Sequence, residues 1–288
     1  MKSISNNIKI GTCSWKYDSW KGIIYSDHVG EAYLEEYTKH FNLVEVDQWF
    51  WSLFGDKIIM PKPDVVQGYA DAVPDDFKFS IKVPNAITLT HQYQKNKKAP
   101  LTSNPHFLSP HLLEDFLRLL DPMAGQIDSL IFQFEYLNKQ KMSGPVEFFE
   151  QLAVFFNQCP AGIRYCIEIR NQNYLKKGYF DFLNSHGLYH VFLQGYWMPS
   201  IFDIYEQFKV HIKDFTVIRL HGPDRKKIEK NAGNQWNRIL EPKDDEINRL
   251  RNMLQDLSDR DIKASVNVNN HYEGSAPLTI QRILDQSS

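Results

Sequence analysis

Polar side chains close several short apolar segments of this sequence, often as pairs two residues apart. The set comprises Glu45 and Asp47, Lys82, Gln133 and Glu135, Glu168 and Arg170, Gln194, Arg219 and His221, and Asn267, Asn269 and His271. Residues two apart on a β-strand face the same side, and a charge buried without a partner is costly. Their repeated occurrence therefore predicts a polar site at the point where the strands end.

Carboxylates beside cations suggest acid–base chemistry on an anionic substrate. We expect Glu45 or Glu168 to be the general base or acid, with His221 as its partner. Two glutamates leave a surplus among the three cations Lys82, Arg170 and Arg219. The planar fork of arginine suits phosphate or carboxylate. The pattern thus predicts an enzyme, of hydrolase or isomerase/lyase type, for a small phosphate- or carboxylate-bearing sugar, polyol or nucleotide-like molecule.

Other interpretations use the same residues. A closed ion-pair network of Glu45, Glu168, Arg170 and Arg219 would only plug the site. A metal-dependent phosphodiesterase or endonuclease-like protein would place a divalent ion on Glu45, Asp47, Glu168 and His221, although the neighbouring cations would repel it. No other cofactor is predicted. A non-catalytic binder of nucleic acid or of a phosphorylated metabolite would need the cations but no general base.

Two further kinds of chemistry are less favoured by the residue types. A glycosidase needs two carboxylates flanking the bond, but the segment at Thr216–Leu220 leads to Arg219 and His221 instead. Cys13 closes the first apolar segment and could act as a nucleophile, but an isolated thiol in such a segment is more often a buried structural residue.

Eight strand-like segments carry these residues, and amphipathic segments separate them. The predicted strands are Ile8–Cys13, Leu43–Val46, Phe77–Val83, Ser129–Phe134, Tyr165–Ile169, Tyr189–Leu193, Thr216–Leu220 and Ala264–Val268. The predicted helices are Glu31–His40, Pro63–Ala72, Ser109–Leu120, Pro145–Cys159, Tyr179–Ser185, Asp244–Leu257 and Pro277–Leu284. This alternation predicts an α/β fold, a (β/α)₈ TIM-type barrel in one domain over residues 1–288, with the polar site at its C-terminal face.

Local signals support these elements. Ser109 followed by Pro110 is a helix start, and Gly187 after Ser185 is a helix stop. No strand is followed by a GxGxxG or GxxxxGK[ST] motif, which disfavours an open nucleotide-binding sheet. The unit around Trp197–Val210 is the least regular part of the pattern.

Three long loops follow predicted strands and would lie over the C-terminal face. They span Ser14–Gly30, Pro84–Ser109 and His221–Lys243. Each mixes aromatic residues with cations, including Lys95, Lys97 and Lys98 in the second loop. Such mixtures bind sugar or base faces and phosphates, although aromatic residues under loops also form small satellite cores.

The composition of the chain limits which classes of protein it can belong to. The 288 residues include 33 Lys and Arg against 35 Asp and Glu, a net charge of −2, which argues against bulk attraction to nucleic acid or to an anionic membrane. Nucleic acid is therefore a disfavoured partner, and no apolar run is long enough for a membrane span. With no signal-like N-terminus and three cysteines outside any CxxC pair, we expect a cytoplasmic protein.

A string of motifs resembles the domain-of-unknown-function 72 (YecE-like) family. The segments are GTCSWKYDSWKG, FNLVEV, FKFSIKVP followed by Thr90–His91, IFQF, CIEIR, VIRLHG and VNVNNHYEGSAP. The resemblance implies a TIM-type barrel and no established reaction. It places in the family's polar set Trp15, Glu45, Lys82, His91, Gln133, Glu168, Arg170, Arg219, His221, Asn269 and Asn270. We expect those outside the acid–base group to bind substrate.

The chain departs from the family pattern at three places. Asp47-Gln48-Trp49-Phe50-Trp51 stands where the family tends to have Asn-Ser-Thr-Phe-Tyr, Glu135 replaces a common proline, and Ser275 replaces a typical tyrosine. The changes add bulk and negative charge near the site, so substrate preference is expected to differ within the family.

Overall fold

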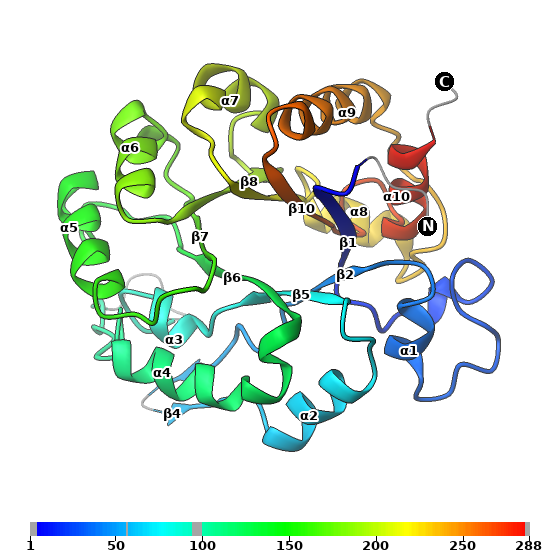
Figure 1. The fold of residues 1–288 in the computed structure, drawn as a ribbon, viewed down its shortest axis with the longest axis horizontal. Helices are drawn as coiled ribbons and strands as arrows, with labels where there is room; N and C mark the ends of the chain where they lie inside the picture. Colours follow the sequence, from blue (N-terminus) through cyan, green and yellow to red (C-terminus); the bar gives the residue numbers. More distant parts are fainter. Residues whose placement is uncertain (1–4, 56, 94–99, 286–288) are drawn as a thin grey trace.

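A closed barrel of parallel strands forms the centre of the molecule (Figure 1). The computed structural model describes residues 5–55, 57–93 and 100–285. Around the barrel the strands follow the order β1-β10-β9-β8-β7-β6-β5-β2. Their bounds are β1 Ile8–Cys13, β2 Leu43–Val46, β5 Lys78–Lys82, β6 Ile127–Gln133, β7 Tyr165–Glu168, β8 Tyr189–Gln194, β9 Phe215–Leu220 and β10 Lys263–Val268. The predicted (β/α)₈ barrel is confirmed.

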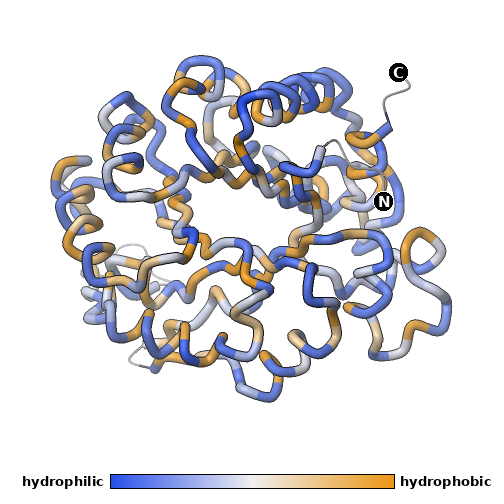
Figure 2. Tube along the Cα trace, viewed as in Figure 1, coloured by the Kyte–Doolittle hydropathy of each residue, from blue (hydrophilic) through white to orange (hydrophobic). Residues whose placement is uncertain are grey.

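Helices surround the barrel between successive strands. They are α1 Tyr33–Tyr37, α2 Pro63–Asp71, α4 Pro110–Leu119, α5 Pro145–Phe156, α6 Lys177–Ser185, α7 Ile201–Phe208, α9 Asp244–Asp259 and α10 Ala276–Leu284. Hydrophobic and hydrophilic segments alternate along these helices (Figure 2), as packing of one helix face on a sheet requires. The described helices include none that is long and apolar enough to cross a bilayer.

The barrel interior changes character along its axis. Ile131, Cys166, Val191 and Val217, from β6, β7, β8 and β9, form an apolar layer. Two residues further along β6, β7 and β9 stand the polar side chains of Gln133, Glu168 and Arg219, and Gln133 pairs in register with Glu168. These polar positions therefore lie at the mouth of the barrel, by which we mean the C-terminal strand ends and the loops that follow them.

Local sequence signals explain several element ends. The Ser109 hydroxyl accepts a hydrogen bond from the Leu112 amide at 3.2 Å, and Pro110 occupies the first turn of α4. Gly187 adopts φ +63° just after α6, a left-handed conformation that favours glycine. The predicted start and stop are both confirmed.

Some elements differ from the prediction. The irregular unit after β8 contains α7, and the loop after β9 contains α8 (Arg225–Ala232). The loop after β2 forms a small antiparallel pair of β3 (Leu53–Phe54) and β4 (Lys57–Ile58), and α3 (Asn85–Thr88) follows β5. The first predicted helix, Glu31–His40, is only five residues long in the structure. These short elements lack the periodicity on which the prediction depended.

A buried histidine of β8, packed against α6, makes stability sensitive to acid. His190 packs among the rings of Tyr179, Phe180 and Phe192, and its Nδ1 lies 3.1 Å from the Tyr179 hydroxyl. Burial lowers the pKa of His190 to about 3. Because the folded-state pKa lies below the unfolded value, this histidine's contribution to stability is complete above about pH 6.5 and is lost as the pH falls.

We predict that acidification from pH 7.5 to pH 5 removes about 2 kcal/mol of unfolding free energy through His190. Replacing the imidazole in His190→Phe should remove this part of the loss, because an aromatic ring fits the same surroundings. Urea unfolding at both pH values measures the loss of unfolding free energy, and His111→Gln, at an exposed histidine, is the control. An equal pH dependence in wild type and His190→Phe would contradict the assignment.

Candidate functional site

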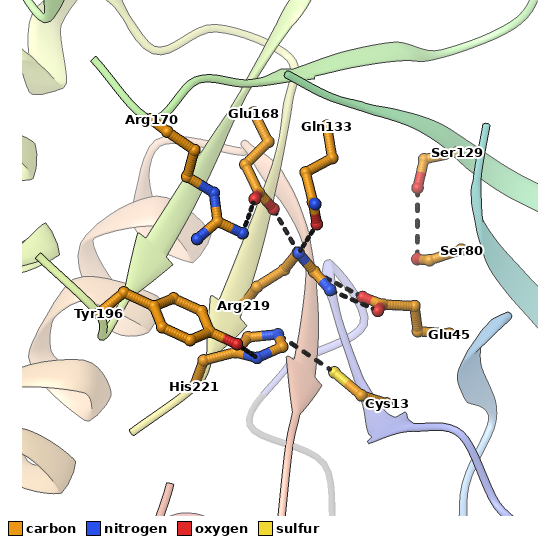
Figure 3. Close-up of polar contacts among 10 residues, drawn as sticks. All are labelled: Cys13, Glu45, Ser80, Ser129, Gln133, Glu168, Arg170, Tyr196, Arg219 and His221. Atoms are coloured by element: carbon orange, nitrogen blue, oxygen red, sulfur yellow. Dashed lines mark hydrogen bonds and ion pairs between the residues drawn. The ribbon is translucent and has the colours of Figure 1, made fainter. Parts of the chain in front are cut away.

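Arg219 lies at the centre of the mouth and is 1% exposed (Figure 3). Its Nε and Nη2 donate to the two oxygens of Glu45 at 2.7 and 2.6 Å. Its Nη1 donates to Glu168 and, at 3.3 Å, to the Gln133 side-chain oxygen. Strands β9, β2, β7 and β6 thus meet at one guanidinium. Arg219, expected to bind substrate, has its side chain engaged by protein groups instead.

Arg170 extends this network toward the outside. Its Nη2 lies 2.6 Å from the second Glu168 oxygen, and its guanidinium carbon lies 4.8 Å from the centre of the Tyr196 ring. Burial alone would raise the pKa of Glu168, but Arg170 and Arg219 overcome this and lower it to about 2. Glu168 is therefore a permanent anion at neutral pH. The ion-pair network considered as an alternative from the sequence is present, and Arg170 forms its outer member.

His221 lies on the other side of Arg219. Its Nδ1 is 3.3 Å from the Tyr196 hydroxyl, and its Nε2 is 3.8 Å from the Cys13 sulfur (Figure 3). Burial, together with Arg219, lowers the pKa of His221 well below its usual value, so the imidazole is neutral. Burial, together with Glu45, raises the pKa of the Cys13 thiol. The pair is consequently a thiol and a neutral imidazole, which does not favour Cys13 as a nucleophile.

Two glycines allow this close approach of the strand ends. A Cβ on Gly195, which adopts φ +132°, would lie 2.4 Å from the His221 carbonyl oxygen. A Cβ on Gly222 would lie 2.0 Å from the carbonyl oxygen of His271. Only glycine lets the loops after β8, β9 and β10 pack this tightly, and their packing fixes the backbone that carries His221.

Lys82 closes β5 and is the mouth cation without a carboxylate partner. It is 8% exposed, and no hydrogen bond or ion pair joins its Nζ to the described residues. Its Nζ lies 3.8 Å from the centre of the Phe50 ring. Burial and Arg219 lower the pKa of Lys82 to about 8, although Glu45, Glu168 and Asp47 oppose the shift. Burial and Glu45 raise the pKa of Asp47.

Asn267 supplies an unsatisfied polar group. It stands opposite Arg219 in the β9–β10 register and is fully buried. Within the described part of the chain, neither its side-chain oxygen nor its nitrogen has a hydrogen-bond partner. Buried amides almost always make such bonds, so Asn267 is an exception among the buried residues of the barrel. The sequence placed it at a strand end, but nothing there distinguished it from Asn269.

An aromatic cavity of about 780 Å³ opens beside Arg170. Tyr136, Tyr196 and Trp197 supply its aromatic lining, with Gln172, Asn173 and Met198 completing it. Trp197 is 85% exposed. Neither Tyr136 nor Tyr196 was singled out from the sequence, since each lies in an irregular loop; the aromatic composition of the chain was the only hint.

The remaining expected substrate-binding residues lie outside this network. Trp15 is buried and packs edge-on against Tyr69 at 4.9 Å between ring centres. His91 lies near Glu135 and Lys141, with its Nδ1 2.9 Å from the Thr90 hydroxyl.

Asn269 and Asn270 bond to backbone amides after β10. Asn269 accepts from the amide of His271 at 2.9 Å, and Asn270 accepts from that of Ala276 at 2.8 Å. These contacts shape the loop. Lys95, Lys97 and Lys98 lie outside the described residues.

A metal-ligand set exists in the mouth, but it differs from the expected one. Potential ligand atoms of Cys13, Glu45 and His221 all lie within 4.8 Å of one another. Asp47 and Glu168 are not part of this group. Both Glu45 oxygens are bonded to Arg219, so a cation bound there would compete with the guanidinium.

Comparison with known proteins identifies the family. The model of the family described as "Protein of unknown function DUF72" matches residues 9–288, and the chain belongs to this family. The resemblance seen in the motifs is thereby confirmed. The "UPF0759 protein YecE" of Escherichia coli strain K12 is 29% identical over 182 residues, 63% of this chain and 55% of that protein. The matched part thus spans about half the length of that relative.

Solved structures show the same fold. A crystal structure of a DUF72 family protein from Thermotoga maritima MSB8 superposes with a TM-score of 0.65 at 17% identity, covering 96% of this chain and 98% of that one. A DUF72 family protein from Enterococcus faecalis V583 gives a TM-score of 0.66 at 18% identity, covering 98% and 96%.

We predict that Arg219→Gln lowers the unfolding free energy by about 3–5 kcal/mol, because it leaves buried carboxylates without their central cation. Urea unfolding at pH 7.5 measures this loss. Arg249→Gln, which breaks the exposed pair with Asp203, should cost at most about 1 kcal/mol.

A neutralised triple variant provides the complementary test. Glu45→Gln, Glu168→Gln and Arg219→Met together remove all three charges, so this variant should regain part of the stability lost in Arg219→Gln. A loss below about 1 kcal/mol in Arg219→Gln would show that the network does not hold the mouth together.

Proposed function

We propose that the protein is an enzyme whose substrate carries an anionic group and a ring, and that it acts by proton transfer at the mouth of the barrel. The observation that carries the proposal is the position of Arg170, which joins the buried ion-pair network to the aromatic cavity. The Glu168 contact engages one nitrogen of the guanidinium, Nη2, and Nε is buried with no hydrogen-bond partner among the described residues. A phosphate or carboxylate of the substrate would accept hydrogen bonds from the nitrogens of Arg170 that do not contact Glu168.

The cavity beside Arg170 indicates what the rest of the substrate looks like. Aromatic walls stack on sugar, base or other ring faces. Tyr136 and Trp197 are both largely exposed, with exposed fractions of 63% and 85%, although they are large apolar side chains. A ring bound between them would bury this surface while its anionic group reaches Arg170. Phosphorylated sugars, nucleotides and ring-bearing carboxylates have this shape.

Proton transfer is assigned to mouth groups that form no ion pair with the arginines. Asp47 has a raised pKa and Lys82 a pKa of about 8, and His221 is a neutral imidazole. Such groups exchange protons near pH 7 better than the strongly acidic Glu168. We therefore propose a positioning role for Glu45 and Glu168, which hold the arginines, in place of the acid–base role expected from the sequence.

A divalent metal remains the second candidate for the chemistry. The cluster of Cys13, Glu45 and His221 favours it, and an ion there would activate water for hydrolysis. Metal analysis of protein purified without chelator or nickel tests this alternative: stoichiometric zinc, manganese or iron that is lost in His221→Ala would support it over metal-free acid–base chemistry.

We predict that phenyl phosphate, which combines a ring with an anion, raises the melting temperature of the protein more than inorganic phosphate or phenol does. Arg170→Gln should weaken its binding about 10- to 100-fold, since a hydrogen bond to a charged group contributes about 1.5–3 kcal/mol. Calorimetric titration measures the affinity. Arg118→Gln, on the exposed side of α4, is the matched control, and equal weakening by both variants would contradict the site.

We also predict that Asp47→Asn lowers turnover about 10²- to 10⁴-fold while leaving the affinity for phenyl phosphate nearly unchanged. Turnover is followed by proton NMR on a panel of sugar phosphates, nucleotides and ring-bearing carboxylates. The exposed Glu150→Gln serves as the carboxylate control. Binding of the panel without product from any member would overturn the enzymatic proposal and leave a binding protein.

A further inference from the structure

Lys82 differs from the other cations of the mouth in what surrounds it. Arg219 and Arg170 are held by carboxylates, whereas Lys82 has no ion pair with any residue in the described ranges. Glu45 and Glu168 are already bonded to the arginines. The amine at the end of Lys82 is therefore nearly buried and unpaired, within the electrostatic reach of Glu168 and Arg219, which is an unusual combination for lysine.

The loop after β2 builds the surroundings of this amine. The Phe50 amide donates to the Asp47 carbonyl at 3.1 Å, and the Asn85 amide donates to the Phe50 carbonyl at 2.7 Å. The Asn85 side-chain oxygen accepts from the Ser52 amide at 2.9 Å, which fixes the loop further. As a result the Phe50 ring lies against the Lys82 Nζ. Asp47 belongs to the same loop, as the first residue after β2.

The electrostatics of the site leave much of this amine uncharged. Burial is the larger cause of the lowered pKa, and the Arg219 guanidinium adds to it. At a pKa of about 8, roughly a quarter of the amine is neutral at pH 7.5, compared with about one part in a thousand for an ordinary lysine. Desolvation and a neighbouring cation are the two means by which a lysine becomes a nucleophile.

We propose that Lys82 is a nucleophile that forms a Schiff base with an aldehyde or ketone substrate carrying an anionic group. This inference rests on the proposed function, since it takes the mouth to be an active site, and it narrows the substrate class to carbonyl compounds. Arg170 binds the anionic group, and the carbonyl carbon meets Lys82 Nζ.

The step balances with solvent as the proton carrier. The uncharged Nζ adds to the carbonyl carbon, a hydronium ion donates a proton to the carbonyl oxygen, and the nitrogen of the adduct returns a proton to water. A second proton from hydronium then goes to the hydroxyl group. The C–O bond breaks, water leaves, and the nitrogen lone pair forms the C=N bond of a protonated imine. No oxidant or reductant takes part.

Reductive trapping tests the proposal on the intact wild-type chain. Glyoxylate, an aldehyde with a carboxylate, is added with cyanoborohydride, and the labelled lysines are identified by peptide mass spectrometry. At pH 7.5 Lys82 should be labelled at least about tenfold faster than the exposed Lys213. The labelling rate of Lys82 should rise with pH with a midpoint near pH 8, whereas that of an ordinary lysine would have its midpoint at its own pKa of about 10.4.

Two variants control the labelling experiment. Lys82→Met keeps the apolar contact with Phe50 and removes the amine, so the fast label should disappear. Lys213→Met should retain it. Labelling of Lys82 no faster than that of Lys213 would overturn the Schiff-base proposal. If phenyl phosphate still binds through Arg170 in that case, the proposed function stands without it; if phenyl phosphate does not bind either, both fail.

Discussion

One buried guanidinium holds the mouth of this barrel together. Arg219 bonds to Glu45 and Glu168 from opposite sides and contacts Gln133, so β9 is tied to β2, β7 and β6 at the level where the chemistry is expected. Burying such charges is tolerable only because each is paired and hydrogen-bonded. The requirement for complete pairing fixes the positions of both carboxylates, and through Glu168 it also fixes Arg170.

The same requirement decides which groups remain for a ligand. Once Glu45 and Glu168 are paired with arginines, the unpaired polar groups of the mouth include the Lys82 amine, the Asn267 amide and the Nε of Arg170, as far as the described residues extend. The charges at the centre then act on these neighbours: burial and Arg219 depress the pKa of Lys82, and burial and Glu45 raise that of Asp47. The ion-pair network and the neighbouring groups with shifted pKa values are therefore parts of one arrangement.

Much of this was predictable from the sequence. Alternation of β-branched and amphipathic segments identified all eight barrel strands, because the period of each element is local information. The polar residues at strand ends identified Glu45, Glu168, Arg170 and Arg219 for the same reason. The sequence left their pairing as one alternative among several, since it depends on side chains that meet across the barrel. Tyr196 was not singled out because it lies in an irregular loop, and only packing shows that it contacts Arg170 and His221. Asn267 was not singled out among the strand-end amides, and only the structure shows that its side chain lacks a partner.

The central claim is that Arg170 presents the ion-pair network to an anionic, ring-bearing substrate. A crystal structure of the protein with phenyl phosphate tests it most directly. The account predicts the phosphate within hydrogen-bond distance of the Arg170 guanidinium and the phenyl ring between Tyr136 and Trp197, with the Arg219 pairs intact. A phosphate bound elsewhere, or one that displaces Glu45 from Arg219, would contradict it.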